Sequence, residues 1–251
     1  MELTTAVLIG GAVAAGFVQG LSGFGFAMVA SSIWVWTLPP QLVAVMAVFG
    51  SLAGQLLTAM TTRRALDLPR LLPLVLGGLV GLPLGVWLLP RLDPALFQFL
   101  LGSLLTLWCP LMLMSAKLPN VSQAGRWADA AAGASGGFAG ALGGYTGALP
   151  TLWCTMRGWD KDTLRGAVQN FNLVMLSCTF ASYLATGLVT RTMWTQFVWV
   201  APALLLPVLA GNRLYARISP EAFKRLVLVL LACTGAALLV KSVPALWARW
   251  V

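Results

Sequence analysis

Residues 16–27 read GFVQGLSGFGFA, and residues 137–148 read GFAGALGGYTGA. Aligned without a gap, the two stretches share five identical residues in twelve, and Phe24 stands opposite Tyr145. Such a repeat indicates an internal duplication. Each copy lies inside a long apolar segment, where glycine lowers helix propensity and tolerates a positive φ. We therefore expect both segments to be interrupted at their glycines.

The composition of the whole chain indicates a membrane protein. Of the 251 residues, 59% are hydrophobic and 9% are charged, whereas about a quarter of the residues of a soluble domain are charged. The net charge of +9 comes from basic residues in short clusters between apolar runs, without the continuous basic surface that nucleic-acid binding requires. We predict an all-α polytopic membrane protein that contacts the lipid bilayer and no nucleic acid.

The apolar segments divide the chain into two halves of four. A single helix over 5–36 would be about 48 Å long, against a hydrocarbon core of about 30 Å. Each half therefore begins with two half-length helices, which either continue through the bilayer or fold back as a re-entrant hairpin. The segments are 5–36, 41–61, 69–90 and 95–115, then 128–155, 164–188, 192–212 and 220–246.

Loop charge distinguishes the two arrangements. Eight crossings would place eight Lys and Arg on each side of the membrane, whereas a hairpin and three crossings per half place twelve on one side and four on the other. The positive-inside rule favours the hairpins. We predict two inverted repeats, each a broken or re-entrant glycine-interrupted helix pair plus three transmembrane helices, with both termini periplasmic. The repeats span 1–115 and 128–251, joined by a connector at 116–127.

The two glycine-rich breaks predict a binding site at mid-membrane. Broken helices free backbone N–H groups there, and the N-termini after Gly25 and Gly147 favour a small anion. The alternative is that the glycines only allow close helix packing. Ser31, Ser32 and Thr151 would add hydroxyl donors. The candidate substrate-binding residues at the breaks are Ser22, Gly23, Phe24, Gly25, Gly144, Tyr145, Thr146 and Gly147.

The sixth segment holds the most polar run within the apolar part of the chain, Gln169, Asn170 and Asn172, preceded by Arg165. Polar side chains at this depth usually face the bundle interior or a cavity. We include Arg165, Gln169 and Asn170 among the candidate substrate-binding residues. Alternatively, Arg165 extends to the headgroups and the amides bridge helices.

Several kinds of functional residue are missing from the apolar segments, and their absence limits the mechanisms that the chain could use. All seven acidic residues lie in loops or at segment ends, and the chain has no His, so the usual groups of a proton relay are missing. There is no phosphate-binding Gly-Lys-Ser/Thr loop. The four cysteines do not have metal-ligand spacing. We predict no metal, no cofactor and no enzymatic activity.

The two-half organisation, the two glycine motifs and Arg165-Gly166-Ala167 at the start of the sixth segment resemble the TauE/SafE sulfite and organosulfonate exporter family of bacterial inner membranes. The resemblance covers nearly the whole chain. It implies export of small sulfur-containing anions such as sulfite or organosulfonates. Uptake of a related small anion, by a permease or a channel, is the alternative, because inverted repeats do not fix a direction. Thr146 and Phe26 depart from the glycine-richer form of the motif.

Overall fold

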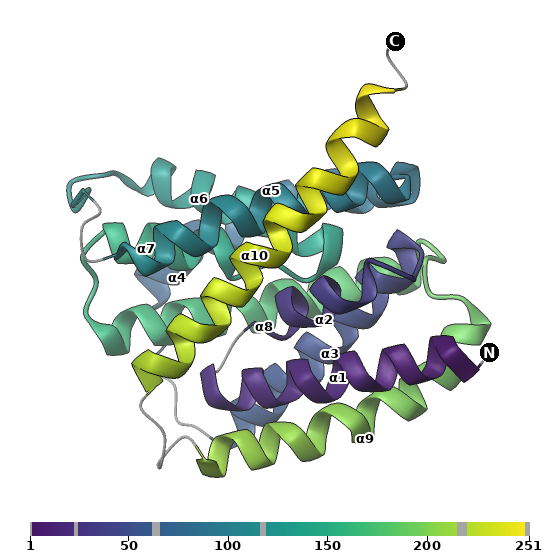
Figure 1. Cartoon of the computed structure of the whole chain (residues 1–251). Coiled ribbons are helices and arrows are strands. Elements are labelled where there is room, and N and C mark those ends of the chain that lie inside the picture. Colours follow the sequence, from purple (N-terminus) through teal and green to yellow (C-terminus); the bar gives the residue numbers. More distant parts are fainter. Residues whose placement is uncertain (1, 23–24, 62–65, 116–118, 215–219, 249–251) are drawn as a thin grey trace.

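The computed structural model describes residues 2–22, 25–61, 66–115, 119–214 and 220–248, and within these ranges all regular structure is helical (Figure 1). This confirms the predicted all-α class for the described residues. The first half contains α1 (Glu2–Ser22), α2 (Phe26–Trp34), α3 (Pro40–Thr61), α4 (Leu68–Leu88), the 3₁₀ turn η1 (Leu89–Arg91) and α5 (Pro94–Leu113). The second half contains α6 (Arg126–Gly143), α7 (Ala148–Met156), α8 (Lys161–Ala185), α9 (Arg191–Leu214) and α10 (Pro220–Trp247).

Aspartates fix the starts of three helices. The Asp67 carboxylate accepts the backbone N–H of Arg70 at the start of α4, and Asp160 accepts that of Thr163 at the start of α8. Asp93 accepts two backbone N–H groups in the first turn of α5. These side chains satisfy donors that have no partner inside the helix. The helices therefore begin at acidic residues in the short polar gaps between apolar segments.

Both long first segments are interrupted as predicted, but not into two half-length helices. The first helices, α1 and α6, have 21 and 18 residues, and α2 and α7, of nine residues each, fold back along them. At the end of α2, the Trp34 indole N–H donates to the carbonyl of Val7 near the start of α1, at 3.0 Å. At the end of α7, the Trp153 indole N–H donates to the Asp129 carboxylate near the start of α6, at 2.8 Å. A helix pair that continued in one direction could not bring these residues together. α1–α2 and α6–α7 are therefore hairpins.

The two halves pack against each other in a reciprocal way. The most extensive helix contacts join α4 to α6, α5 to α10 and α1 to α9, each pair made of one helix from each half. In element order, α1 of the first half corresponds to α6 of the second, and α4 corresponds to α9. The pair α1–α9 is therefore the counterpart of the pair α6–α4 when the two halves are exchanged. Figure 1 shows α1 and α9 lying side by side along one edge of the molecule.

Glycines allow the two reciprocal helix pairs to approach closely. A Cβ atom at Gly77 or Gly81 of α4 would overlap the carbonyl oxygen of Ala130 or Ala134 in α6. In the other pair, a Cβ at Gly16 of α1 would lie 2.6 Å from the Leu204 carbonyl oxygen in α9. Small residues at helix contacts are a general device of membrane bundles. Close packing therefore explains these glycines of α1 and α4.

The core lies around α3, where residues 43–48 are fully buried. The outer faces of α4, α9 and α10 instead expose large apolar side chains, such as Leu76, Val198 and Leu230, which suits contact with hydrocarbon. In the described part of the chain, six helices are long and apolar enough to cross a membrane: α1, α3, α4 with η1, α5, α9 and α10. The 25 residues of α8 also have the length, but the first half of α8 is polar.

Candidate functional site

A cavity lies where the two helix breaks approach α3 and α8. The space that the centre of a water molecule can occupy there is about 30 Å³, which is enough for at least one water molecule. The corresponding helices of both halves contribute to its wall. The lining residues are Gln19 of α1; Gly25, Ala27 and Met28 at the start of α2; Ser51 and Gln55 of α3; Gly144, Tyr145, Thr146, Gly147 and Ala148 at the second break; and Asn172 and Leu176 of α8.

Two glycines set the backbone direction at the breaks. Gly25 precedes α2 with φ 99°, and Gly144 follows α6 with φ 80°. Side chains disfavour this left-handed region, so glycine is needed at both places. The Gly144 N–H donates to the carbonyl of Gly140 and satisfies one acceptor at the end of α6. The chain can therefore reverse direction within a few residues in each half.

The first turns of α2 and α7 adjoin the cavity and carry backbone donors. No side chain caps either helix, and the first three N–H groups of a helix have no acceptor within it. In α2 these groups belong to Phe26, Ala27 and Met28. In α7 the Ala148 N–H donates to the Tyr145 carbonyl, and Pro150 has no N–H, so α7 offers fewer donors than α2.

Amides and hydroxyls complete the polar part of the wall. Gln19 is 2% exposed, and its side-chain amide nitrogen is buried without a hydrogen-bond partner. The Thr146 hydroxyl donates to the Asn172 amide oxygen at 2.9 Å. The Asn172 side chain therefore has its amide N–H₂ group as the donor that it can offer to a ligand. The cavity is therefore lined by neutral polar groups rather than by ionised side chains.

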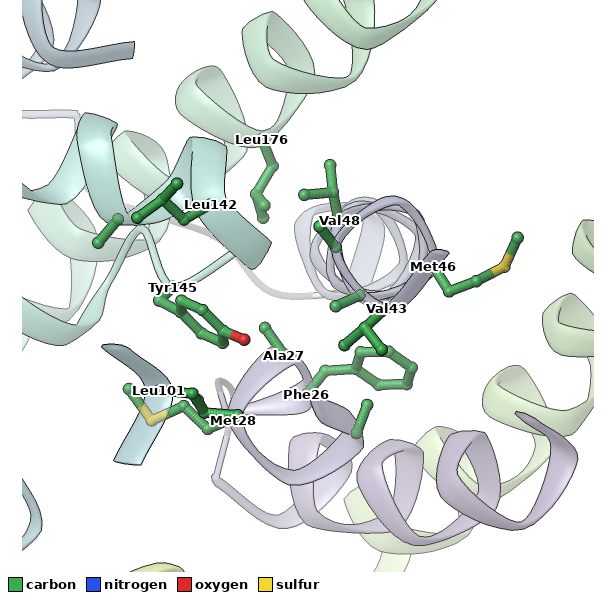
Figure 2. Close-up of a cluster of buried hydrophobic side chains, with 14 of the residues drawn as sticks. Phe26, Ala27, Met28, Val43, Met46, Val48, Leu101, Leu142, Tyr145 and Leu176 are labelled. Carbon is green, nitrogen blue, oxygen red and sulfur yellow. The ribbon is translucent and has the colours of Figure 1, made fainter. Parts of the chain in front are cut away.

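The Tyr145 side chain forms part of the cavity wall. Figure 2 shows the Tyr145 side chain with its hydroxyl pointing toward Ala27 of α2 and away from Leu142. That hydroxyl is within interaction range of the Ser31 hydroxyl, but neither makes a hydrogen bond of normal geometry. Buried polar groups without partners are costly, so the hydroxyl of Tyr145, which lines the cavity, favours occupation by a ligand or water; Ser31 is not part of the cavity wall.

The structure brings together five of the predicted site residues and separates three others. The five that line the cavity are Gly25, Gly144, Tyr145, Thr146 and Gly147. Arg165 is exposed in the second turn of α8, and Gln169 and Asn170 lie on the same helix but do not line the cavity. Gly23, Phe24 and the side chain of Ser22 lie outside the described residues.

The other predicted hydroxyl donors lie on the two hairpins. Ser32 donates to the backbone carbonyl of Val29 within α2. Thr151 of α7 is buried, and its hydroxyl makes no hydrogen bond. Neither residue is part of the cavity wall.

Several residues of the cavity wall were not among the predicted site residues. Gln19 lies inside the repeated motif itself, and Ser51, Gln55 and Asn172 follow on the next helices. The motif repeats at an offset of 121 residues, and the same offset relates Ser51 to Asn172. Extending the alignment beyond the motif would therefore have identified this polar pair.

The family described as Sulfite exporter TauE/SafE matches residues 8–238 of the chain. The chain belongs to the TauE/SafE sulfite exporter family. The match begins within α1 and ends within α10, so it extends well beyond the two glycine motifs. No curated protein and no solved structure matches the chain.

Membership in the TauE/SafE family agrees with the apolar helices. Together they make this protein a multi-pass membrane protein of a transporter family. The family implies a small anion as the substrate. The cavity at the breaks is the candidate site for that anion.

Proposed function

We propose that this protein exports a small sulfur-containing anion, sulfite or an organosulfonate, across the bacterial inner membrane. The observation that carries the proposal is the meeting of two helix breaks, one from each half, around one polar cavity in a TauE/SafE chain. Uncapped N-termini of α2 and α7 adjoin the cavity, and helix N-termini favour anions. The anion would bind between the N-termini, Gln19 and the Asn172 amide.

The hairpins imply the topology. If α1–α2 and α6–α7 each return to the face on which they begin, then α3, α4 and α5 cross the membrane in the first half, and α8, α9 and α10 cross it in the second. Three crossings per half place the hairpins on opposite faces. Residues 1–115 and 128–251 then form inverted repeats joined by the connector 116–127, as in many transporters.

Two further observations support this topology. The reciprocal contacts α1–α9 and α4–α6 are those that a two-fold axis in the membrane plane would produce. The loops 61–70, 116–127, 157–165 and 213–225 fall on one face and hold twelve of the sixteen Lys and Arg, which assigns that face to the cytoplasm. Both termini are then periplasmic.

Anion flux from proteoliposomes tests the proposed function. Vesicles loaded with sulfite or methanesulfonate should lose the anion much faster when they contain the protein, and chloride and sulfate should not leave at the same rate. The matched variants are Gly147→Leu and Gly10→Leu. A Cβ at Gly147 would lie 2.7 Å from the Asn172 amide nitrogen, whereas a Cβ at Gly10 would have nothing within 4 Å.

Gly147→Leu should therefore lose the flux, and Gly10→Leu should keep it. The absence of flux for every sulfur anion would refute the proposed function. Equal flux in the two leucine variants would show that the substrate passes elsewhere.

A further inference from the structure

The cavity between the breaks contains no fixed charge. Among its lining residues the only titratable side chain is Tyr145, a phenol that is neutral at physiological pH. The described ion pair of this hairpin, Arg157 with Asp129 at 3.1 Å, joins the end of α7 to the start of α6, at the opposite end of the hairpin from the break. Any positive potential in the cavity therefore comes from dipoles.

The dipoles give an upper limit for that potential. A helix N-terminus is equivalent to about half an elementary charge, so α2 and α7 together supply about one positive charge at most. The C-termini of α1 and α6 lie at the same breaks and carry the opposite partial charge, which lowers the sum. The cavity can offset one negative charge but not two.

Gln19 supplies the directional part of the site. Its amide nitrogen is a buried donor without a partner, in a side chain that lines the cavity. The close approach of Gln19 to α3 depends on Gly54, where a Cβ atom would overlap the Gln19 amide nitrogen. A neutral amide donates a hydrogen bond to an anion without adding a positive charge to the site. It therefore strengthens binding without increasing the number of negative charges that the site can offset.

We propose that the cavity selects a singly charged oxyanion over a doubly charged one, with the Gln19 amide as a donor to it. This inference rests on the proposed function and deepens it. The cost of removing an ion from water rises with the square of its charge, whereas its attraction to fixed dipoles rises only in proportion to the charge. The desolvation cost of a dianion would be offset best by a cationic side chain, and the residues that line the cavity include none. The transported form of sulfite is then its singly protonated monoanion.

The experiment compares anions of fixed and of variable charge in proteoliposomes. Sulfite flux is measured at equal pH on both sides, at several pH values around its second ionisation. Methanesulfonate, always singly charged, and sulfate, always doubly charged, are measured alongside. Sulfite flux should fall with the monoanion fraction as pH rises, methanesulfonate flux should stay constant, and sulfate should be excluded.

The outcomes separate this inference from the proposed function. Sulfite flux that persists when only the dianion remains, or sulfate flux comparable to that of methanesulfonate, would overturn monoanion selection while keeping the transporter. A parallel fall for methanesulfonate would also overturn it, because the protein rather than the anion would then be titrating. If no sulfur anion crosses at any pH, the proposed function itself fails.

Variants of Gln19 test its part. Gln19→Leu should raise the methanesulfonate KM about tenfold to a hundredfold, the range for losing a hydrogen bond to a charged group. Gly54→Ala should act in the same direction, because it displaces the Gln19 amide. The matched control is Gln98→Leu in α5. Gln98 is also buried, but its amide nitrogen donates to the Val35 carbonyl at 2.9 Å, and Gln98 does not line the cavity.

Gln98→Leu should therefore lower stability without changing the KM. An unchanged KM in Gln19→Leu would remove Gln19 from the site. If neither Gln19→Leu nor Gly54→Ala folds, the pH series on the unmodified protein still decides the valence.

Discussion

At the residue scale, each break depends on a glycine with positive φ. Gly25 and Gly144 differ in position, since the first starts a helix and the second ends one, but both turn the chain so that it reverses direction. No non-glycine residue in the described ranges has a positive φ. The two breaks therefore use the backbone conformation that only glycine adopts without strain.

Gly144→Ala should lower the free energy of unfolding by about 1–2 kcal/mol, the cost of a left-handed conformation for a residue with a Cβ. It should also lower anion flux, because the new Cβ would lie 3.2 Å from the Ala27 Cβ beside the cavity. The control is Gly125→Ala before α6, where φ is −78° and nothing lies within 4 Å of a Cβ. Thermal unfolding in detergent and flux in vesicles measure the two effects. Equal stability of the two variants would show that a side chain at position 144 does not strain the backbone.

The sequence predicted the site residues in part, for a physical reason. Gly25 and Gly144 were predictable because a glycine cluster in an over-long apolar segment indicates a break. Gln19 was not predicted, since a single glutamine in an apolar run has no period that shows whether it faces lipid, another helix or a cavity. Arg165 and Gln169 were selected for their chemistry, and the direction in which α8 presents them depends on tertiary packing.

At the element scale, the two hairpins are closed differently. In the first, Trp34 contacts the backbone of Val7. In the second, the Asp129 carboxylate accepts the Trp153 indole N–H and pairs with Arg157, whose guanidinium also donates to backbone carbonyls of the connector at Val121 and Ser122. The second hairpin is thus closed by a largely buried ion pair, and the hydrogen bonds of Arg157 to the two carbonyls fix it to the connector between the halves.

Asp129→Ala should destabilise the protein by about 3 kcal/mol, because removing one partner leaves the other charge largely buried and uncompensated. The control is Arg70→Ala. The Arg70–Asp67 pair has side-chain exposures of 46% and 35%, and exposed pairs contribute about 0–1 kcal/mol. Thermal unfolding of the two variants in the same detergent measures the difference. A loss no larger than that of Arg70→Ala would show that Asp129 and Arg157 do not hold the hairpin.

Single cysteines test the arrangement of the helices in the membrane, in a background without the four native cysteines. Cysteines replacing Leu66 and Asp162 should react with an impermeant reagent from the cytoplasm, and cysteines replacing Leu3 and Thr190 should react from the periplasm. All four positions are exposed. Labelling of positions 66 and 162 from opposite faces would exclude inverted repeats and restore eight crossings.

Most helices were predictable from the sequence because lipid imposes a length and an apolar composition on each crossing. The segment predicted at 95–115 is α5 over Pro94–Leu113, and the break predicted in 128–155 separates α6 from α7. The Asp129–Arg157 pair was not predictable, because its partners are 28 residues apart and meet only when α7 folds back. The residue that corresponds to Asp129 in the first hairpin, 121 positions earlier, is Leu8. The repeat therefore did not indicate an acidic residue with a partner at this place.

At the scale of the whole molecule, the contacts between halves limit how the cavity can open. The reciprocal helix pairs α4–α6 and α1–α9 each join one half to the other through glycine contacts with backbone carbonyls. Contacts of this kind have no flexible side chains to absorb a relative shift. We therefore expect each pair to move as a unit, so that exposure of the cavity to either side comes from motion of α4–α6 relative to α1–α9.

Transport through such a cavity should be electrogenic and should not be coupled to a proton carried by the protein. An anion that leaves a cell with a negative interior gains about 2.3 kcal/mol per charge at 100 mV. Since 1.4 kcal/mol is a factor of ten, this supports a concentration ratio of about fifty-fold for a monovalent anion. Export therefore needs no coupling ion, and the sequence provides neither His nor a carboxylate in the middle of an apolar segment to carry a proton.

Methanesulfonate is the suitable probe, because its charge does not change with pH. Its efflux from proteoliposomes at clamped potential should rise with an inside-negative voltage, carry one charge per anion and stay the same when a pH gradient is imposed. Empty vesicles at the same voltages give the leak. Efflux that ignores voltage but follows the pH gradient would contradict this mechanism, because the anion would then have to move together with a proton on a group outside the cavity.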